Sequence, residues 1–256
     1  MVHGIFKNFR ERNVAITDGV FAIAMTILVL EIAVPTVSDI TSGVALNEYF
    51  VNYLLPSILI YFLSFYIVYN FWENTVILFN FKKVSNNVLS LNILTLATVC
   101  LIPFATGFIF QFYNYKVVNI FFSLLVMVIS LLYILMFVVL VRENYSEHFK
   151  KKEEIKETIH KTYDDGIELP NLKLYVRGVV LTLFYLLLSP FISSIISLIL
   201  AFFSPQAILL SFVLILILRF IIRMKRSTKD KLFNIELTDE EKYLIENIRE
   251  GIYGEE

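Results

Sequence analysis

Six long apolar runs constrain the fold of this chain more than any other feature of its sequence. A helix needs roughly 20 apolar residues to cross the hydrocarbon core of a bilayer, and lipid cannot satisfy the backbone groups of an open strand. We therefore expect an all-α fold, a polytopic bundle of six transmembrane helices over residues 1–223, with a cytosolic helical tail at 224–256. The expected spans are about 14–34, 49–72, 88–110, 117–141, 178–200 and 205–222.

The composition agrees with a membrane protein and argues against several other classes. Of the 256 residues, 57% are hydrophobic and 18% are charged, whereas soluble domains average about half and about a quarter. The formal net charge of −1 gives no reason to expect a nucleic-acid partner. The single cysteine, Cys100, excludes an intramolecular disulfide. The first apolar run is too long for the core of a cleavable signal peptide, so we expect none.

The distribution of lysine and arginine predicts the orientation of the spans. Basic residues precede the first span, and they recur between the second and third spans, between the fourth and fifth, and after the sixth. On the opposite side, Lys116 is the one basic residue, and the loop "PTVSDITSGVALNEY" carries two acids and no base. Cytoplasmic loops are enriched in lysine and arginine. Both termini are therefore expected in the cytoplasm.

Two charged segments are expected outside the membrane. The loop at 142–177 should begin as a helical extension of the fourth span and break at Asp164-Asp165-Gly166. The tail carries a capping box from Thr238 to Glu241, followed by apolar residues on one helical face. The tail helix could pack on the protein's own loops or on a neighbouring subunit, or it could dock a partner protein.

The sequence gives no support for an enzyme. It contains no HExxH, CxxC or GxSxG motif and no glycine-rich phosphate loop. Asp18 is the one aspartate expected inside a span, so a pair of apposed aspartates is not expected. We therefore expect no catalytic residue, no cofactor and no tightly bound metal ion.

The first span separates polar, small and branched residues onto different faces. At about 100° per residue, and with Asp18 at 0°, Ile23, Ile27 and Leu30 lie near 140°, 180° and 120° and form one apolar stripe. Small residues lie between about 40° and 100°, a pattern suited to close helix packing: Gly19, Ala22, Thr26 and Ala33. The apolar stripe could contact lipid or core, or it could line a pore that gates by dewetting. Periodicity alone leaves both interpretations open.

Three stretches together resemble the transmembrane protein 175 family, the endolysosomal potassium channels and their bacterial relatives. The family has an arginine, three residues and then Phe-Ser-Asp at the start of helix one, and this chain has Arg12 followed by Ile16-Thr17-Asp18. The second span contains "YFLSFYIVYNFW" and the third "LNILTLATVCLIPFATGF", both similar to family patterns. Ile16 and Thr17 depart from Phe and Ser, and Thr75 stands where many relatives have a histidine.

The resemblance implies a homotetrameric potassium channel whose pore is lined by helix one. It implies leak-like conduction without the TVGYG filter, which is absent from this sequence. By position it assigns the hydrophobic constriction to Ile23, with Thr26, Ile27 and Leu30 beyond it. It assigns Arg12, Thr17 and Asp18 to a structural motif that holds helix one. The second and third spans supply a helix-packing motif: Trp72, Asn92, Pro103, Phe104 and Thr106.

Several questions stay open at this stage. Glu31 could attract cations at the outer mouth of a pore, or it could simply lie in water. A secondary transporter and a non-conducting membrane scaffold are the alternatives to a channel. The expected partners are further copies of the chain, membrane lipid and monovalent cations, with K⁺ passing transiently. The single six-helix unit favours a prokaryotic plasma membrane.

Overall fold

A computed structural model describes the backbone of residues 2–32, 46–81, 84–112, 114–162, 170–203, 213–222 and 224. Every regular element in this part of the chain is a helix, which confirms the all-α expectation. The first elements are α1 (Val2–Leu30), the short α3 (Leu46–Tyr49), a π-helical turn η1 (Phe50–Leu54) and α4 (Leu55–Phe79). They are followed by α5 (Asn86–Val99), α6 (Leu101–Phe112), α7 (Lys116–Thr162), α8 (Pro170–Phe203) and a short apolar helix at Val213–Ile222.

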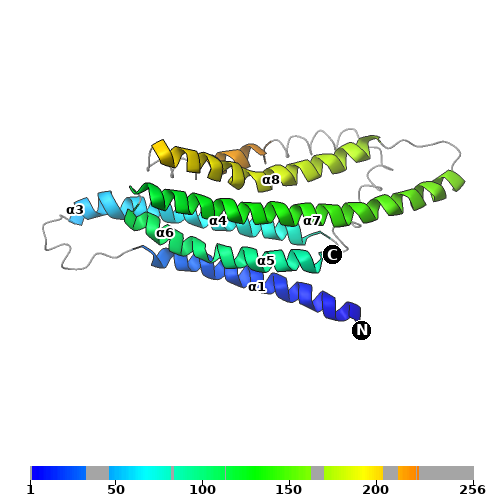
Figure 1. The fold of residues 1–256 in the computed structure, drawn as a ribbon, viewed down its shortest axis with the longest axis horizontal. Helices are drawn as coiled ribbons and strands as arrows, with labels where there is room; N and C mark the ends of the chain where they lie inside the picture. Colours follow the sequence, from blue (N-terminus) through cyan, green and yellow to red (C-terminus); the bar gives the residue numbers. More distant parts are fainter. Residues whose placement is uncertain are drawn as a thin grey trace.

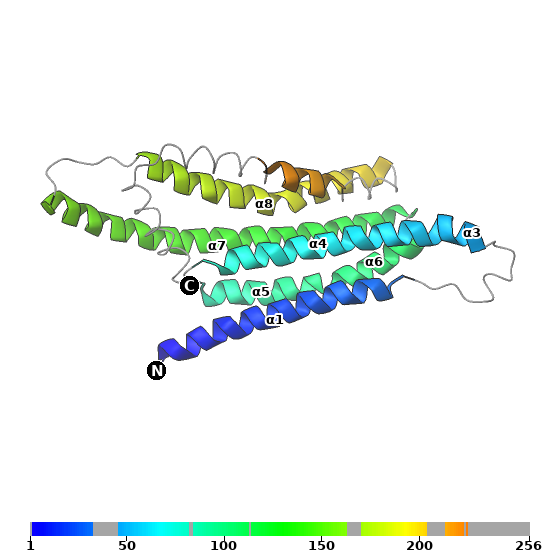
Figure 2. The same ribbon diagram turned by 180° about the vertical axis from the view of Figure 1, so that it is seen from behind.

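The helices form an elongated bundle of roughly parallel rods (Figure 1). α8 packs on α7, and α7 contacts α4, α5 and α6 on its other side. α1 packs on the far side of α4, α5 and α6, so it lies at the edge of the bundle away from α8 (Figure 2). Helix one is therefore covered on one side by the protein and open on the other.

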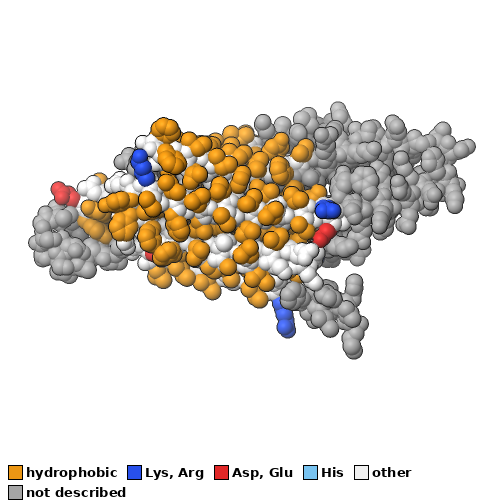
Figure 3. Space-filling model, in the orientation of Figure 1, with side chains coloured by type: hydrophobic (Ala, Val, Ile, Leu, Met, Phe, Trp, Pro, Cys, Tyr) orange, Lys and Arg blue, Asp and Glu red, His pale blue; other side chains and the backbone are white. Residues whose placement is uncertain are grey.

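Five described segments are long and apolar enough to cross a membrane: Arg10–Leu30, Phe50–Phe79, Asn86–Phe112, Lys116–Asn144 and Leu181–Phe203. Val213–Ile222 is the described part of the sixth expected span. The face drawn in Figure 3 carries a broad apolar band, with charged side chains near its two ends. This distribution fits a bundle whose middle lies in lipid and whose ends meet water.

Two boundaries differ from those expected. Helix α4, which carries most of the second expected span, continues beyond Trp72 to Phe79, and Glu73 and Asn74 in this extension bind Arg219 inside the bundle. The third span is two helices that meet at Cys100. Pro103 accounts for this break, since proline has no N–H to continue the ladder and its ring crowds the carbonyl four residues earlier.

The charged segment after the fourth span is helical as far as Thr162, which confirms that the loop begins as an extension of that span. The turn expected at Asp164-Asp165-Gly166 lies outside the described residues. So does nearly all of the tail expected at 224–256, including the capping box at Thr238. The division between the transmembrane bundle and the tail stays a prediction.

Candidate pore helix and its polar anchors

The buried face of α1 combines polar and apolar side chains at helical spacing. Its members recur every three or four residues, the spacing of one helix face, and each is less than a tenth exposed: Asn13, Thr17, Phe21, Ala24 and Leu28. Relative to Asp18 they lie between about 220° and 300° around the helix. This arc is the side that packs on α4, α5 and α6.

A second face of α1 carries large apolar side chains that the chain itself does not cover. Ile23 is 60% exposed, Ile27 38% and Leu30 78%. Thr26 lies on the same side, and its hydroxyl donates a hydrogen bond to the carbonyl oxygen of Ile23 at 2.8 Å. Because this bond holds the hydroxyl proton, the oxygen lone pairs of Thr26 are left as acceptors. All four candidate pore residues thus lie on the uncovered face of the single chain.

Asp18 lies at the margin of the buried face, where it binds α4. The indole nitrogen of Trp72 donates a hydrogen bond to Asp18 Oδ1 at 2.8 Å. A hydrogen bond to an ionised carboxylate is stronger than one between neutral groups. The structure thus brings together Asp18 and Trp72, two residues that the sequence placed on different spans.

A buried amide–hydroxyl cluster joins α1 to α5. Asn92 Nδ2 donates to Asn13 Oδ1 and to Thr17 Oγ1, each at 2.9 Å, and the Thr17 hydroxyl donates to the Asn13 carbonyl at 2.8 Å. All three residues are buried. The sequence singled out Thr17 and Asn92 but missed Asn13. The signal that could have found it is its position four residues before Thr17, which places it on the same helix face.

Two arginines near the start of the first span have different surroundings. The Arg10 guanidinium donates hydrogen bonds to the carbonyl oxygens of Phe79 and Phe81, the latter at 3.0 Å. These carbonyls lie at the C-terminal end of α4, where unpaired acceptors and the helix dipole favour a cation. Arg12, the residue expected to hold helix one, is exposed in the single chain. At about 120° it falls on the side of the apolar stripe, whereas Arg10 at about 280° falls on the buried arc.

The remaining members of the expected helix-packing motif have different surroundings. Thr106 is buried, and its hydroxyl lies 3.2 Å from Ser64 Oγ of α4. Pro103 is buried just after the break between α5 and α6. Phe104 is 54% exposed, and its ring packs against Phe108 with centroids 4.9 Å apart.

Thr75, which stands where relatives have a histidine, binds α7 and not helix one. It is buried, and its hydroxyl lies 2.6 Å from the hydroxyl of Tyr133. The aromatic ring of Tyr133 also stacks on Phe71, with centroids 5.5 Å apart. Helix one is held instead by the contacts of Trp72 and Asn92.

Glu31 follows the last residue of α1 and leans onto α6. A Cβ atom built on Gly107 would overlap Glu31 Oε2, so the carboxylate occupies space that only a glycine leaves open. Glu31 continues the buried arc of the helix, at about 220°. Its carboxylate is therefore directed toward the wall of the bundle and away from the stripe of Ile23, Ile27 and Leu30.

Comparisons with known proteins point to one family. Residues 12–103 match the sequence profile of the family described as endosomal/lysosomal potassium channel TMEM175. A potassium channel of Chryseobacterium sp. (strain P1-3) is 31% identical over 174 residues, which cover 67% of this chain and 81% of that protein. The crystal structure of a lysosomal potassium-selective channel TMEM175 homolog from Chamaesiphon minutus has a similar fold. Its TM-score is 0.58 at 21% identity, covering 84% of this chain and 98% of that one.

Proposed function

The chain belongs to the TMEM175 family of endosomal/lysosomal potassium channels, and from this premise we propose that it conducts potassium through a pore lined by α1. The observation that carries the proposal is the division of α1 into two faces. Its polar residues Asn13, Thr17 and Asp18 bind or face the bundle, while Ile23, Ile27 and Leu30 are left uncovered. A pore-lining helix needs this division, because the bundle must hold one side while the other meets the permeation path.

Four copies of the chain would complete such a pore. One six-helix unit offers a single copy of α1, so an axial path requires several chains, and we propose a homotetramer. Rings of Ile23, Ile27 and Leu30 would then surround the axis. Branched apolar side chains hold water weakly, and a ring of them gates by dewetting. Conduction would therefore be leak-like, limited by an apolar constriction whose narrowest ring is Ile23.

Selectivity in this pore would rest on dehydration and on few oxygen ligands. The sequence has no TVGYG filter, so no rings of backbone carbonyls of that kind are available. Thr26 is the polar residue beside the stripe on the uncovered face, and its hydroxyl donates a hydrogen bond to the carbonyl oxygen of Ile23. Four Thr26 oxygens could share the hydration shell of a passing cation. We propose a modest preference for K⁺ over Na⁺, with K⁺ bound transiently and no cofactor.

The placement in the cell follows from the bacterial relative and from the charges. We propose a prokaryotic plasma membrane with both termini in the cytoplasm, because Lys and Arg concentrate on that side of the spans. In this orientation Glu31 lies at the outer end of α1, and the apolar band of Figure 3 contacts lipid. The carboxylate would act on cations through its field and not as a ligand in the pore, since it leans onto Gly107.

The direct test is single-channel recording of the purified full-length protein in planar bilayers. Under opposed K⁺ and Na⁺ gradients we expect discrete current steps with a reversal potential displaced toward that of K⁺. Steps with no discrimination between the two ions would contradict the selectivity. If cross-linking shows that the preparation is tetrameric and yet no current passes, the proposal that the protein is a channel would be contradicted.

A secondary transporter is the second candidate, favoured by one observation. The third span is broken at Cys100 into α5 and α6, and discontinuous helices are typical of transporters. Flux that saturates with substrate and follows a proton gradient would support this alternative. Single-channel current steps would exclude it.

A further inference from the structure

Four consecutive residues of α4 contact three different helices. Trp72 binds Asp18 of α1, Glu73 and Asn74 bind Arg219 of the helix at Val213–Ile222, and Thr75 binds Tyr133 of α7. Successive residues of a helix point about 100° apart, so neighbours on several sides of α4 are engaged at the same level. A rotation of α4 would disturb all of these contacts together.

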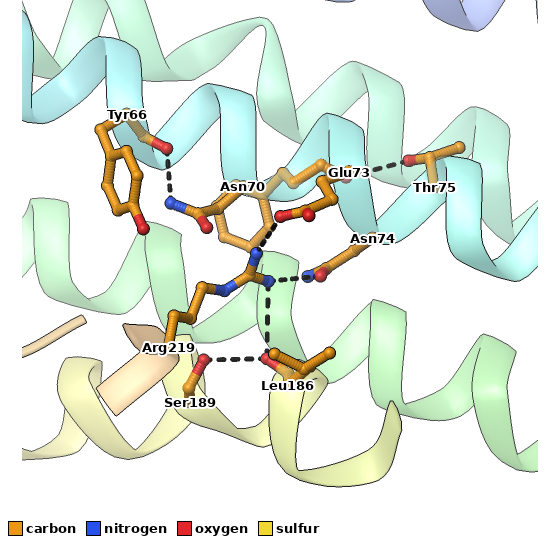
Figure 4. Close-up of polar contacts among 9 residues, drawn as sticks. Tyr66, Asn70, Glu73, Asn74, Thr75, Leu186, Ser189 and Arg219 are labelled. Carbon is orange, nitrogen blue, oxygen red and sulfur yellow. Dashed lines mark hydrogen bonds and ion pairs between the residues drawn. The ribbon is translucent and has the colours of Figure 1, made fainter. Parts of the chain in front are cut away.

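Arg219 is the least expected member of this group. It lies in the apolar stretch "VLILILRFII", yet it is only 1% exposed. Its Nη1 forms an ion pair with Glu73 Oε2 at 2.7 Å, and its Nη2 donates to Asn74 Oδ1 and, at 3.5 Å, to the carbonyl oxygen of Leu186 in α8 (Figure 4). One guanidinium thus joins two adjacent side chains of α4 to the backbone of α8.

Stability alone does not explain an arginine at this position. An ionised side chain within a span is costly and usually has a functional role. Replacing a buried ion pair by apolar residues of similar volume often leaves stability unchanged or increases it. What the arginine adds is geometry, because the planar fork of its guanidinium fixes the direction of the groups it binds. Because Arg219 binds both Glu73 and Asn74, it fixes the rotation of α4 about its own axis.

We propose that Arg219 is a positioning residue for the pore helix. By holding Glu73 and Asn74, it sets the rotation of α4 that presents the Trp72 indole nitrogen to Asp18. Trp72 directly precedes Glu73, so the contact with α1 and the contact with Arg219 share one turn of helix. The orientation of the α1 stripe, and with it the open probability of the channel, then depends on a residue in the last described helix. The expected effect of Arg219 on current rests on the proposed channel function, whereas its expected effect on the position of Trp72 does not.

The first experiment uses the fact that Trp72 is the one tryptophan of the chain. Fluorescence of the full-length protein in lipid, excited at a wavelength that tryptophan absorbs and the 14 tyrosines do not, therefore reports on Trp72 alone. We compare Arg219→Met/Glu73→Met, a charge-compensated pair suited to folding, with Asp18→Ala, which removes the acceptor of the indole. The emission maximum should shift in both, and in the same direction. Wild-type emission in the Met pair would overturn the proposal, whether or not the protein conducts.

Two control variants test whether the shift in emission comes from the geometry of the Arg219 contacts. One tests the positive charge of Arg219 as the cause, and the other tests the loss of any buried polar contact as the cause. Arg219→Lys keeps the positive charge but cannot grip Glu73 and Asn74 with one planar fork, so its emission should shift too. Wild-type emission in Arg219→Lys would assign the effect to charge and overturn the positional role. Ser197→Ala removes the hydroxyl contact with Ser123, 2.7 Å away between α8 and α7, a hydrogen bond in which no residue of α4 takes part, and should leave the emission of Trp72 unchanged. A shift of the same size in Ser197→Ala would also overturn the proposal.

The second experiment measures open probability per channel, which does not depend on how much protein folds. Trp72→Phe and the Arg219→Met/Glu73→Met pair should each change open probability by about twofold or more, the lower end of coupling within one contact network. The triple variant should match either one, since both changes break the same link. Effects that multiply independently would overturn the link between Arg219 and α1. Absence of current from the wild type would contradict the proposed function, and the fluorescence result would still decide the role of Arg219.

Discussion

Trp72 of α4 holds Asp18 of α1 through a hydrogen bond of 2.8 Å from the indole nitrogen to Oδ1. The aspartate that appeared misplaced in an apolar span is therefore an anchor at the margin of the buried face. Its carboxylate points to a neighbouring helix of the same chain, and the apolar stripe of α1 lies on another side. This separation between anchor and stripe underlies the predictions that follow.

Removing the acceptor at position 18 should weaken the bundle without changing ion preference. Asp18→Ala loses the charge-assisted bond to Trp72, and we expect a loss of about 1–2 kcal/mol in the free energy of unfolding. Asp18→Asn keeps an oxygen acceptor and should lose less than half of that. Thermal unfolding in detergent measures both. A changed ratio of K⁺ to Na⁺ permeability in Asp18→Asn would show that the residue contacts the ion after all.

Asn92 should be the most sensitive of the polar anchors. Asn92→Leu removes both hydrogen bonds to α1 and leaves the buried oxygen of Asn13 without its donor, at a cost of about 2–3 kcal/mol. Asn13→Leu/Asn92→Leu removes both partners and should recover part of the loss. Denaturant unfolding of the two variants and of Asn13→Leu completes a double-mutant cycle. Additive losses would mean that the pair does not interact.

Arg10 and Arg12 should differ sharply, although they lie two positions apart. Arg10→Gln breaks the contacts with the carbonyls of Phe79 and Phe81 and should cost about 1.5–3 kcal/mol. Arg12→Gln, exposed in the single chain, should change the stability of the monomeric bundle by no more than about 0.5 kcal/mol. Unfolding of protein dissociated into monomers measures both. If Arg12→Gln lowers the stability of the proposed tetramer but not of the monomer, the role of Arg12 lies between subunits.

Gly107→Ala tests the close approach of Glu31 to α6. The added methyl group would displace the Glu31 carboxylate, which is the far end of a flexible side chain, so we expect a destabilisation of no more than about 0.5 kcal/mol. Glu31→Ala in the same protein removes the obstacle and should restore stability. A loss well above that, recovered by Glu31→Ala, would mean that the carboxylate cannot move aside.

The effect of the Glu31 charge on permeating cations can be measured separately, as single-channel conductance. Glu31→Gln keeps the shape of the side chain and removes the charge. A lower conductance at low ionic strength that disappears at high salt would identify Glu31 as an outer-mouth charge, because salt screens such an effect. Equal conductance at both salt concentrations would favour a residue that simply lies in water.

Ile23→Asn tests the constriction directly. A ring of amides would hold water where isoleucine excludes it, so we expect a several-fold higher single-channel conductance and weaker selectivity for K⁺. The matched control is Leu135→Asn on α7, another apolar side chain that is 45% exposed in the single chain but lies outside α1. It should leave both quantities unchanged. Unchanged currents in Ile23→Asn would remove Ile23 from the pore.

The spans and the family were accessible from the sequence because they depend on local properties. Twenty consecutive apolar residues identify a span whatever surrounds it, and the motif around Asp18 is read along one stretch of chain. The partners of the polar residues inside the bundle were not accessible, for the complementary reason. Glu73 and Asn74 bind Arg219, which lies 146 and 145 residues away in the sequence. A charged residue within the last apolar run was the available signal for that partner.

The sequence by itself determined that this chain is a helical membrane protein with one face of α1 polar and small and another branched and apolar. The tertiary structure decided which side chains meet. Arg10, and not Arg12, binds the end of α4, and Asn13 joins Thr17 in binding Asn92. Gly107 leaves room for Glu31, and Arg219 links α4 to α8. The physical reason is geometric. A residue type fixes what a side chain can bind, but only the rotation and packing of neighbouring helices bring a donor within 3 Å or so of its acceptor.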